Sequence, residues 1–296
     1  MTTIVPAVLL GVAVLLAGSL PWGALLAPLN LRLLPTVPWA MLPMAAYLWV
    51  YWRYIGGRIG PRASAAQRRE RLRAHPLAPE VWAMALLTGL TGFAALLALT
   101  AVMARLMVMP ESGQIVTPPA MPTVTVIALL VMASVVAGVT EEAAFRGYMQ
   151  GPIERRYGLA AAILVNGVMF GLLHFPNHRE AVLAMLPYYV AVTAVYSGLT
   201  WATNSIFPAV VLHVGGDVWS LSRLWATGQP EWQRSGDVQP LVWAAGPDAA
   251  FLWGVVLLTV FGAATVALCR NLQKLAAGAG STSQPAPALE LDENES

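Results

Sequence analysis

Six ionisable side chains lie inside segments of this 296-residue chain that are otherwise apolar enough to cross a lipid bilayer. They are two adjacent carboxylates and an arginine, followed by two histidines and an aspartate: Glu141, Glu142, Arg146, His174, His213 and Asp217. Because charged groups inside a membrane are costly, such residues are functional candidates by default. Carboxylates and imidazoles that share one depth could carry out hydrolysis by general acid–base chemistry.

The composition is that of an integral membrane protein. Hydrophobic residues make up 57% of the chain and charged residues 11%, against about 25% charged residues in soluble domains, and the mean hydropathy is +0.63. The net charge of +2 comes from basic loops and gives no indication of nucleic-acid binding. We therefore expect the lipid bilayer, and no nucleic acid, among the partners of this protein.

Hydropathy along the chain predicts an all-α bundle of about eight transmembrane helices. The expected spans are 4–27, 37–55, 81–107, 124–150, 159–174, 181–203, 206–221 and 249–268. We expect one transmembrane bundle over residues 1–275, with the ionisable motifs in its region 124–221. Residues 276–296 are small, polar and acidic, which predicts a disordered tail.

A strongly basic loop sets the expected orientation. Seven arginines between positions 53 and 73 are accompanied by one acidic residue, Glu70. The positive-inside rule places this loop in the cytoplasm, and counting spans outward from it places both termini there as well. The short loops suit a bacterial plasma membrane.

The rise of an α-helix predicts that the ionisable groups share one layer of the membrane. At about 1.5 Å per residue, Glu141 lies ~21 Å and His174 ~24 Å from the cytoplasmic ends of their spans. On the same basis His213 and Asp217 lie ~14 and ~20 Å from the cytoplasmic end of theirs. A common depth on three helices favours one shared cavity over three unrelated buried groups.

Spacing within the first group separates two roles. Glu142 and Arg146 are four residues apart and share a helix face, where they can form a structural ion pair. Glu141 points about 100° away from that face and is left to act as a base in a cavity. The alternative is an amphipathic helix end whose charges reach the membrane interface.

The other two groups repeat the four-residue spacing. Phe170 can pack beside His174 and limit the rotamers of the imidazole. Asp217 can orient His213 or share a metal with it. Between them, two adjacent glycines at 215 and 216 would permit either close approach of a neighbouring helix or a cleft.

At these residues the chain resembles the CAAX-protease and bacteriocin-processing family of intramembrane proteases. The three family motifs, EExxxR, FxxxH and Hxxx followed by Asn or Asp, correspond to segments 141–146, 170–174 and 213–217. The resemblance implies an eight-helix membrane endopeptidase whose cavity opens towards the cytosol and whose substrate is a membrane protein or peptide.

The resemblance also implies roles for individual residues. Glu141 would be the general base that activates a water molecule, with His174 as its partner. His213 and Asp217 would stabilise the oxyanion of the tetrahedral intermediate. The supporting residues would be Glu142, Arg146 and Phe170.

Asp217 departs from the members that process prenylated proteins, which typically carry asparagine there. Because an ionised carboxylate cannot donate to an oxyanion, Asp217 is either protonated, or orients His213, or binds a metal. A zinc site would use two histidines and two carboxylates, namely His174, His213, Glu141 and Asp217. No HExxH helix is present, so a glutamate that activates water without a metal stays the other reading.

Two functions of another kind fit the same residues. The first is a non-catalytic membrane scaffold or bacteriocin self-immunity protein, which would tolerate the loss of Glu141 and His174. The second is a proton-coupled transporter, which would be expected to show repeated halves and broken helices in matching positions. The sequence contains no such repeat, and nothing in it identifies a prenyl group as part of the substrate.

Overall fold

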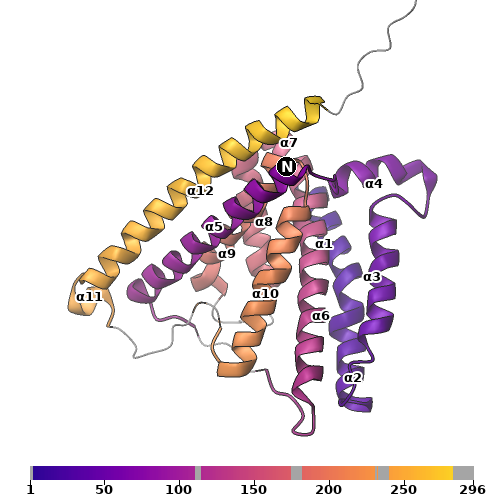
Figure 1. Ribbon diagram of the computed structural model, residues 1–296, viewed down its shortest axis with the longest axis horizontal. Coiled ribbons are helices and arrows are strands. Elements are labelled where there is room, and N and C mark those ends of the chain that lie inside the picture. The colour runs from indigo at the N-terminus through magenta and orange to yellow at the C-terminus, as the bar shows by residue number, and fades with distance from the viewer. Residues whose placement is uncertain (1–2, 111–114, 175–181, 231, 233–239, 283–296) are drawn as a thin grey trace, which may run out of the picture.

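The fold is a bundle of long helices (Figure 1). The computed structural model describes residues 3–110, 115–174, 182–230, 232 and 240–282, and these residues contain no β-strand. The prediction of an all-α membrane bundle is thus confirmed. Its physical basis is that a chain crossing lipid must satisfy every backbone N–H and C=O within its own segment, which a helix does.

The elements follow one another along the chain without long insertions. The N-terminal third contains α1 (Ile4–Leu20), the π-helix η1 (Pro21–Leu26), α2 (Ala27–Leu33), α3 (Met41–Ile55), the 3₁₀ turn η2 (Arg62–Ser64), α4 (Ala65–Leu72) and α5 (Pro79–Leu106). The remainder contains α6 (Thr123–Glu142), the π-helix η3 (Ala143–Met149), α7 (Gln150–Tyr157), α8 (Leu159–Leu173), α9 (Val182–Thr203), α10 (Phe207–Thr227), α11 (Val242–Ala245) and α12 (Ala249–Thr282).

The expected count of about eight spans is not confirmed. Among the described residues, five helices are long and apolar enough to cross a membrane: 4–33, 79–106, 123–157, 183–203 and 249–279. Helices α3 and α8 have 15 residues each, which is about 22 Å and less than the ~30 Å of a hydrocarbon core. Helix α10 has 21 residues, but His213, Asp217 and Arg223 lower its hydropathy.

Several boundaries differ from those predicted by hydropathy. The span expected at 124–150 continues through η3 and α7 to Tyr157, and the span expected at 249–268 continues as α12 to Thr282. Hydropathy misses these extensions because a helix does not end where its side chains become polar. The rest of the expected acidic tail, 283–296, lies outside the described residues, so its disorder stays a prediction.

The basic loop and the ends of three helices lie at one end of the bundle. Arg73, which follows α4, donates through Nε to Asn204 Oδ1 at 2.9 Å and through Nη1 to Glu154 Oε2 at 3.2 Å. Arg155 of α7 pairs with Glu70 of α4 at 3.5 Å, and both helices lie at the upper end of the bundle in Figure 1. We call this region the basic end.

Helices α6 and α10, which carry two of the three motifs, pack directly against each other. A side chain at Gly138 of α6 would come within 2.5 Å of Val214 Cγ2 and 3.1 Å of the Val214 nitrogen in α10. Of the two possibilities left open for the paired glycines, tight packing or a cleft, the structure has the cleft: among the described residues nothing lies within 4 Å of a side chain added at Gly215, Gly216 meets only ordinary contacts from 3.7 Å, and both line a cavity. Gly138 is the small residue that brings the two motif helices together.

Candidate active site

The first motif lies where an α-helix passes into a π-helix. Glu141 and Glu142 are the last residues of α6, and Arg146 lies in η3, all of whose residues are buried. A π-helical turn widens the backbone ladder and is frequent at functional sites. The Phe145 carbonyl in this turn accepts from the Gln150 N–H and, at 3.0 Å, from the Asn166 side chain of α8. These bonds hold the π-helical turn against α8.

Glu142 and Arg146 form the expected ion pair deep in the bundle. Arg146 Nη1 donates to Glu142 Oε1 at 3.1 Å, and both side chains have an exposed fraction of 0%. Aromatic rings surround the rest of the guanidinium, whose central carbon lies 5.0 Å from the Tyr196 ring, 5.5 Å from Phe170 and 5.7 Å from Phe145. The buried positive charge is thus balanced by one carboxylate and three π-faces.

His213 lies among three carboxylates from α6 and α10. Its Nδ1 donates to Glu142 Oε1 at 2.7 Å, with the proton assigned to the nitrogen because a carboxylate oxygen accepts. Its Nε2 lies 3.6 Å from Glu141 Oε2 and 3.6 Å from Asp217 Oδ2. These two distances exceed hydrogen-bond length but are short enough for strong electrostatic interaction.

Aromatic packing fixes the plane of the His213 ring. The Tyr196 ring of α9 is stacked on it, with centroids 5.1 Å apart and an interplanar angle of 9°. Phe170 of α8 contacts it edge-on at 6.3 Å. Since the ring is held by these two aromatic contacts and through Nδ1, its Nε2 has a fixed direction.

His174 follows α8 directly and is oriented by the turn that ends this helix. Its Nδ1 lies 2.8 Å from the Phe170 carbonyl oxygen, which only accepts, so Nδ1 carries a proton; in the neutral form of the ring the lone pair is then on Nε2. The ring packs 4.6 Å from Phe170 and 5.1 Å from Tyr189. The expected Phe170–His174 packing is therefore present.

A cavity of about 650 Å³ joins these groups. Its wall includes all four residues to which the sequence assigned chemistry: Glu141, His174, His213 and Asp217. Glu142 and Arg146 do not line it and lie buried behind the wall. The structure thus separates the two adjacent glutamates as their helical positions predicted, with Glu141 on the cavity and Glu142 in the ion pair.

The cavity lies in the half of the bundle away from the basic end. On α9 its lining runs from Tyr188 to Tyr196, whereas the basic end is at Asn204. On α10, which begins at the basic end, the lining runs from Val211 to Leu224. The cavity therefore extends from the Glu141 layer towards the end of the bundle opposite the arginine-rich loop.

The geometry gives no support to the zinc alternative. Among the described residues, no three His, Cys, Asp or Glu side chains come together as a group that could hold a metal ion. His213 Nδ1 and His174 Nδ1 are bonded to Glu142 and to a backbone carbonyl. The steps proposed below accordingly use the groups of the chain itself.

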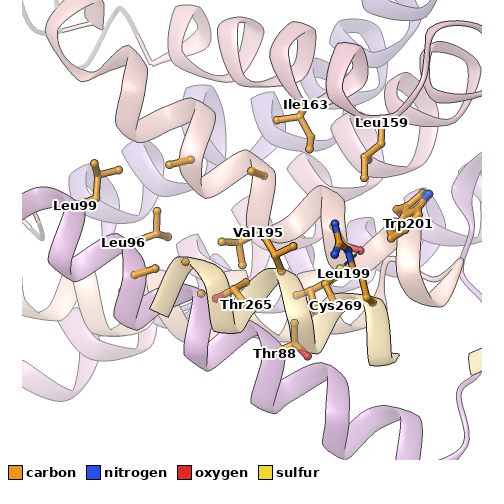
Figure 2. A pocket seen from close by; sticks show the side chains of 18 of the residues that line it. Thr88, Leu96, Leu99, Leu159, Ile163, Val195, Leu199, Trp201, Thr265 and Cys269 are labelled. Carbon is orange, nitrogen blue, oxygen red and sulfur yellow. Dashed lines mark hydrogen bonds between the residues drawn. The ribbon is translucent and has the colours of Figure 1, made fainter. Parts of the chain in front are cut away.

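A second cavity, of about 460 Å³, lies between α5, α8, α9 and α12 (Figure 2). Its wall is almost wholly apolar, with side chains such as Leu96, Leu159 and Val195. Among the described residues, the ionisable side chains that line it are Cys269 and Arg270. The carboxylates and imidazoles to which the sequence assigned chemistry line the first cavity, which is therefore the candidate active site.

Two tyrosines and an asparagine belong to the site although the sequence motifs did not predict them. Tyr196 and Tyr189 of α9 pack on His213 and His174, and Asn166 of α8 fixes the π-helical turn. Each is a polar group inside an apolar span, the signal that identified the six ionisable residues. Asn166 precedes Phe170 by four residues, and Tyr196 precedes Asn204 by eight. The same estimate of depth from the helix rise could therefore have been made for both residues.

Fold and site together define a helical integral membrane protein with a buried carboxylate–histidine site at a cavity. Residues 123–219, about a third of the chain, match the family model described as "Type II CAAX prenyl endopeptidase Rce1-like". This match confirms the resemblance inferred from the three motifs, all of which it contains. Searches among curated proteins and among solved structures give no match.

Proposed function

We propose that this protein is an intramembrane endopeptidase that hydrolyses peptide bonds of membrane-associated or lipidated proteins or peptides. The observation that carries the proposal is the convergence of Glu141, His213 and Asp217, from two helices, on one cavity that His174 also lines. The similarity to type II CAAX prenyl endopeptidases supports protein substrates at a membrane and makes a prenylated C-terminal tail one substrate class to test.

In the first step, Glu141 acts as general base on a water molecule in the cavity. It takes one proton from the water while the oxygen forms a bond to the carbonyl carbon of the scissile peptide. His174, with its lone pair on Nε2, accepts a hydrogen bond from the same water and orients it. The electron pair of the carbonyl double bond moves to the oxygen, which becomes an oxyanion.

In the second step the tetrahedral intermediate collapses. Protonated His213 would donate through Nδ1 to Glu142 and through Nε2 towards the oxyanion. The electron pair returns to the carbon, the carbon–nitrogen bond breaks, and the leaving nitrogen takes the proton held by Glu141. Atoms and charge balance without any further reactant.

We further propose that the basic end lies in the cytoplasm of a bacterial plasma membrane. Its arginines support this by the positive-inside rule, and α1 begins at this end, where Gly11 lies against Met149. In this orientation the cavity lies towards the other face of the membrane, which differs from the cytosolic opening that the family resemblance implies. Cysteine labelling from the two sides of the membrane distinguishes the two possible openings of the cavity.

The test compares the membrane proteome and the secreted peptides of the native host carrying either the wild-type chain or Glu141→Gln at matched protein levels. We expect new chain ends that appear only with the wild type, and these ends would identify the substrate. If the two proteomes are identical while deletion of the gene still has a phenotype, the protein is a scaffold or immunity protein and the catalytic proposal is wrong.

A further inference from the structure

The proposed mechanism leaves the oxyanion short of donors. His213 Nδ1 is already bonded to Glu142, and its Nε2 lies between two carboxylates at 3.6 Å each. An ionised Asp217 accepts hydrogen bonds and cannot donate them. Because oxyanion stabilisation is usually the largest single contribution to catalysis of this kind, a further donor in the cavity wall would be consequential.

Tyr196 of α9 places a hydroxyl group at the part of the cavity wall that Glu141 and His213 also line. Its side chain is 4% exposed and lines the same wall as Glu141 and His213. Its oxygen lies 3.9 Å from the point where a side chain on Gly216 would begin. Gly216 is the residue before Asp217, so the hydroxyl lies beside the segment of α10 between His213 and Asp217.

Packing fixes the Tyr196 ring on three sides. It is stacked on His213 at 5.1 Å, meets the Phe93 ring edge-on at 6.0 Å, and carries the Arg146 guanidinium 5.0 Å from its centre. A ring with this surround has little freedom to turn. The direction of its hydroxyl is therefore set before any substrate binds, as an oxyanion donor requires.

The hydroxyl makes no hydrogen bond to any residue that the structure describes, although two other buried tyrosines, Tyr51 and Tyr148, each donate to a backbone carbonyl. A buried tyrosine hydroxyl normally finds a partner. One that lacks a protein partner and borders the cavity of the candidate site is available to a ligand. The absence of a side chain at Gly216 leaves room for that ligand beside it.

We infer that Tyr196 is a catalytic residue whose hydroxyl donates a hydrogen bond to the carbonyl oxygen of the scissile peptide and, more strongly, to the oxyanion. No proton is transferred by Tyr196 in this step. The hydroxyl supplements His213 and removes the need for a protonated Asp217. The inference rests on the proposed endopeptidase function.

The test uses the full-length protein in detergent or nanodiscs and an internally quenched peptide built on the cleavage site found in the proteome comparison. We expect Tyr196→Phe to lower kcat by roughly 100-fold, the lower part of the loss seen when one oxyanion donor is removed, with KM changed less than about threefold. We also expect a phosphinic peptide, which mimics the tetrahedral intermediate, to lose affinity by a similar factor, because tight binding of such analogues uses the same contacts.

Tyr51→Phe is the matched control. It also removes a buried tyrosine hydroxyl, whose bond to Val14 O is 3.0 Å long, but it does so on α3 outside the cavity. We expect its kcat to equal that of the wild type. An unchanged kcat in Tyr196→Phe, with Glu141→Gln inactive, would overturn the inference and leave the endopeptidase proposal intact. Cleavage by Glu141→Gln at the wild-type rate would instead overturn the endopeptidase proposal.

If Tyr196→Phe lowers the melting temperature, its loss of kcat could come from lost stability. A second variant keeps the test decisive in that case. Incorporation of 3,5-difluorotyrosine at position 196 keeps the ring and the hydroxyl and makes the hydroxyl more acidic. Since the donor is lost when the phenol ionises, we expect the alkaline decline of kcat to move to lower pH. The same alkaline decline as in the wild type would contradict the inference.

Discussion

His213 on α10 and Glu142 on α6 are joined by a hydrogen bond of 2.7 Å from Nδ1 to Oε1. The same oxygen accepts from Arg146 at 3.1 Å. Glu142 therefore links the π-helical turn to α10, in addition to balancing the charge of Arg146. Because of this link, Glu142 is a structural residue, and its replacement should lower the stability of the protein as well as its activity.

Glu142→Gln is expected to destabilise the protein strongly. The change leaves the Arg146 charge buried without its partner, and removal of one member of a buried ion pair costs about 3–5 kcal/mol. The measurement is denaturant or thermal unfolding in detergent. The control is Glu70→Gln, which breaks the exposed Glu70–Arg155 pair and should cost less than about 1 kcal/mol. Equal losses in the two variants would show that Glu142 does not have this role.

His174→Gln is expected to lower kcat by roughly 10²- to 10⁴-fold, the usual contribution of a positioned acid–base group. The melting temperature should stay close to that of the wild type, because His174 is only half-buried. Activity on the reporter peptide and thermal unfolding are measured together. His75→Gln, an exposed histidine outside the cavity wall, provides the control. A His174→Gln variant with full activity would remove this residue from the mechanism.

Asp217→Asn separates the roles left open for this carboxylate. If Asp217 only orients His213 or donates when protonated, an amide of the same shape should keep kcat within about tenfold, since it can still hydrogen-bond to Nε2 at this distance after a small movement. Asp217→Leu, which has no polar group, should lose at least another tenfold. The measurement is kcat for both variants. Loss of all activity in Asp217→Asn would show that the reaction requires the negative charge of Asp217.

Asp248, outside the membrane-spanning part of α12, is expected to make stability depend on pH. Two hydrogen bonds from Arg105 Nη1, 2.8 and 2.9 Å long, lower the pKa of the Asp248 carboxyl. The folded protein therefore binds fewer protons here than the unfolded chain, so the stabilisation is present above the ordinary aspartate value of about 3.9 and is lost as pH falls through the lowered value.

Melting temperatures of the wild type and of Asp248→Asn test this effect. We expect the wild type to melt higher at pH 7 and the two to converge at an acidic pH below the lowered pKa of the Asp248 carboxyl. Asparagine can still cap α12 through the Phe251 N–H, which Asp248 Oδ1 accepts at 2.9 Å, so the comparison isolates the charge. A difference between the two proteins that is the same at both pH values would contradict the prediction.

Membrane-impermeant maleimide labelling tests the orientation. In a Cys269→Ala background, we expect a cysteine at Glu70 to react only from the cytoplasm and one at Val116, which is 82% exposed, only from the other side. A cysteine at Ser220 in the cavity wall then reports the opening. Reaction of Ser220→Cys from the Val116 side agrees with the cavity position described above, and reaction from the Glu70 side supports the cytosolic opening implied by the family.

The local arrangement of the motif residues could be predicted from the sequence because helix geometry is the same in every helix. A separation of four residues places Glu142 beside Arg146, and a separation of one residue turns Glu141 to another face. The rise per residue placed Glu141, His213 and Asp217 at similar depth, and the structure brings Glu141 Oε2 and Asp217 Oδ2 each to 3.6 Å from His213 Nε2. Composition likewise sufficed for the all-helical membrane fold, since lipid permits few alternatives.

Contacts between helices depended on the tertiary structure. Sequence periodicity does not reveal that Gly138, and not Gly215, brings α6 against α10, or that Glu142 also binds His213. It does not place the Tyr196 ring of α9 on that imidazole. These relations depend on the rotation of each helix about its axis and on the π-helical turn after Glu142, both of which are set by packing among neighbours that lie far apart in the chain.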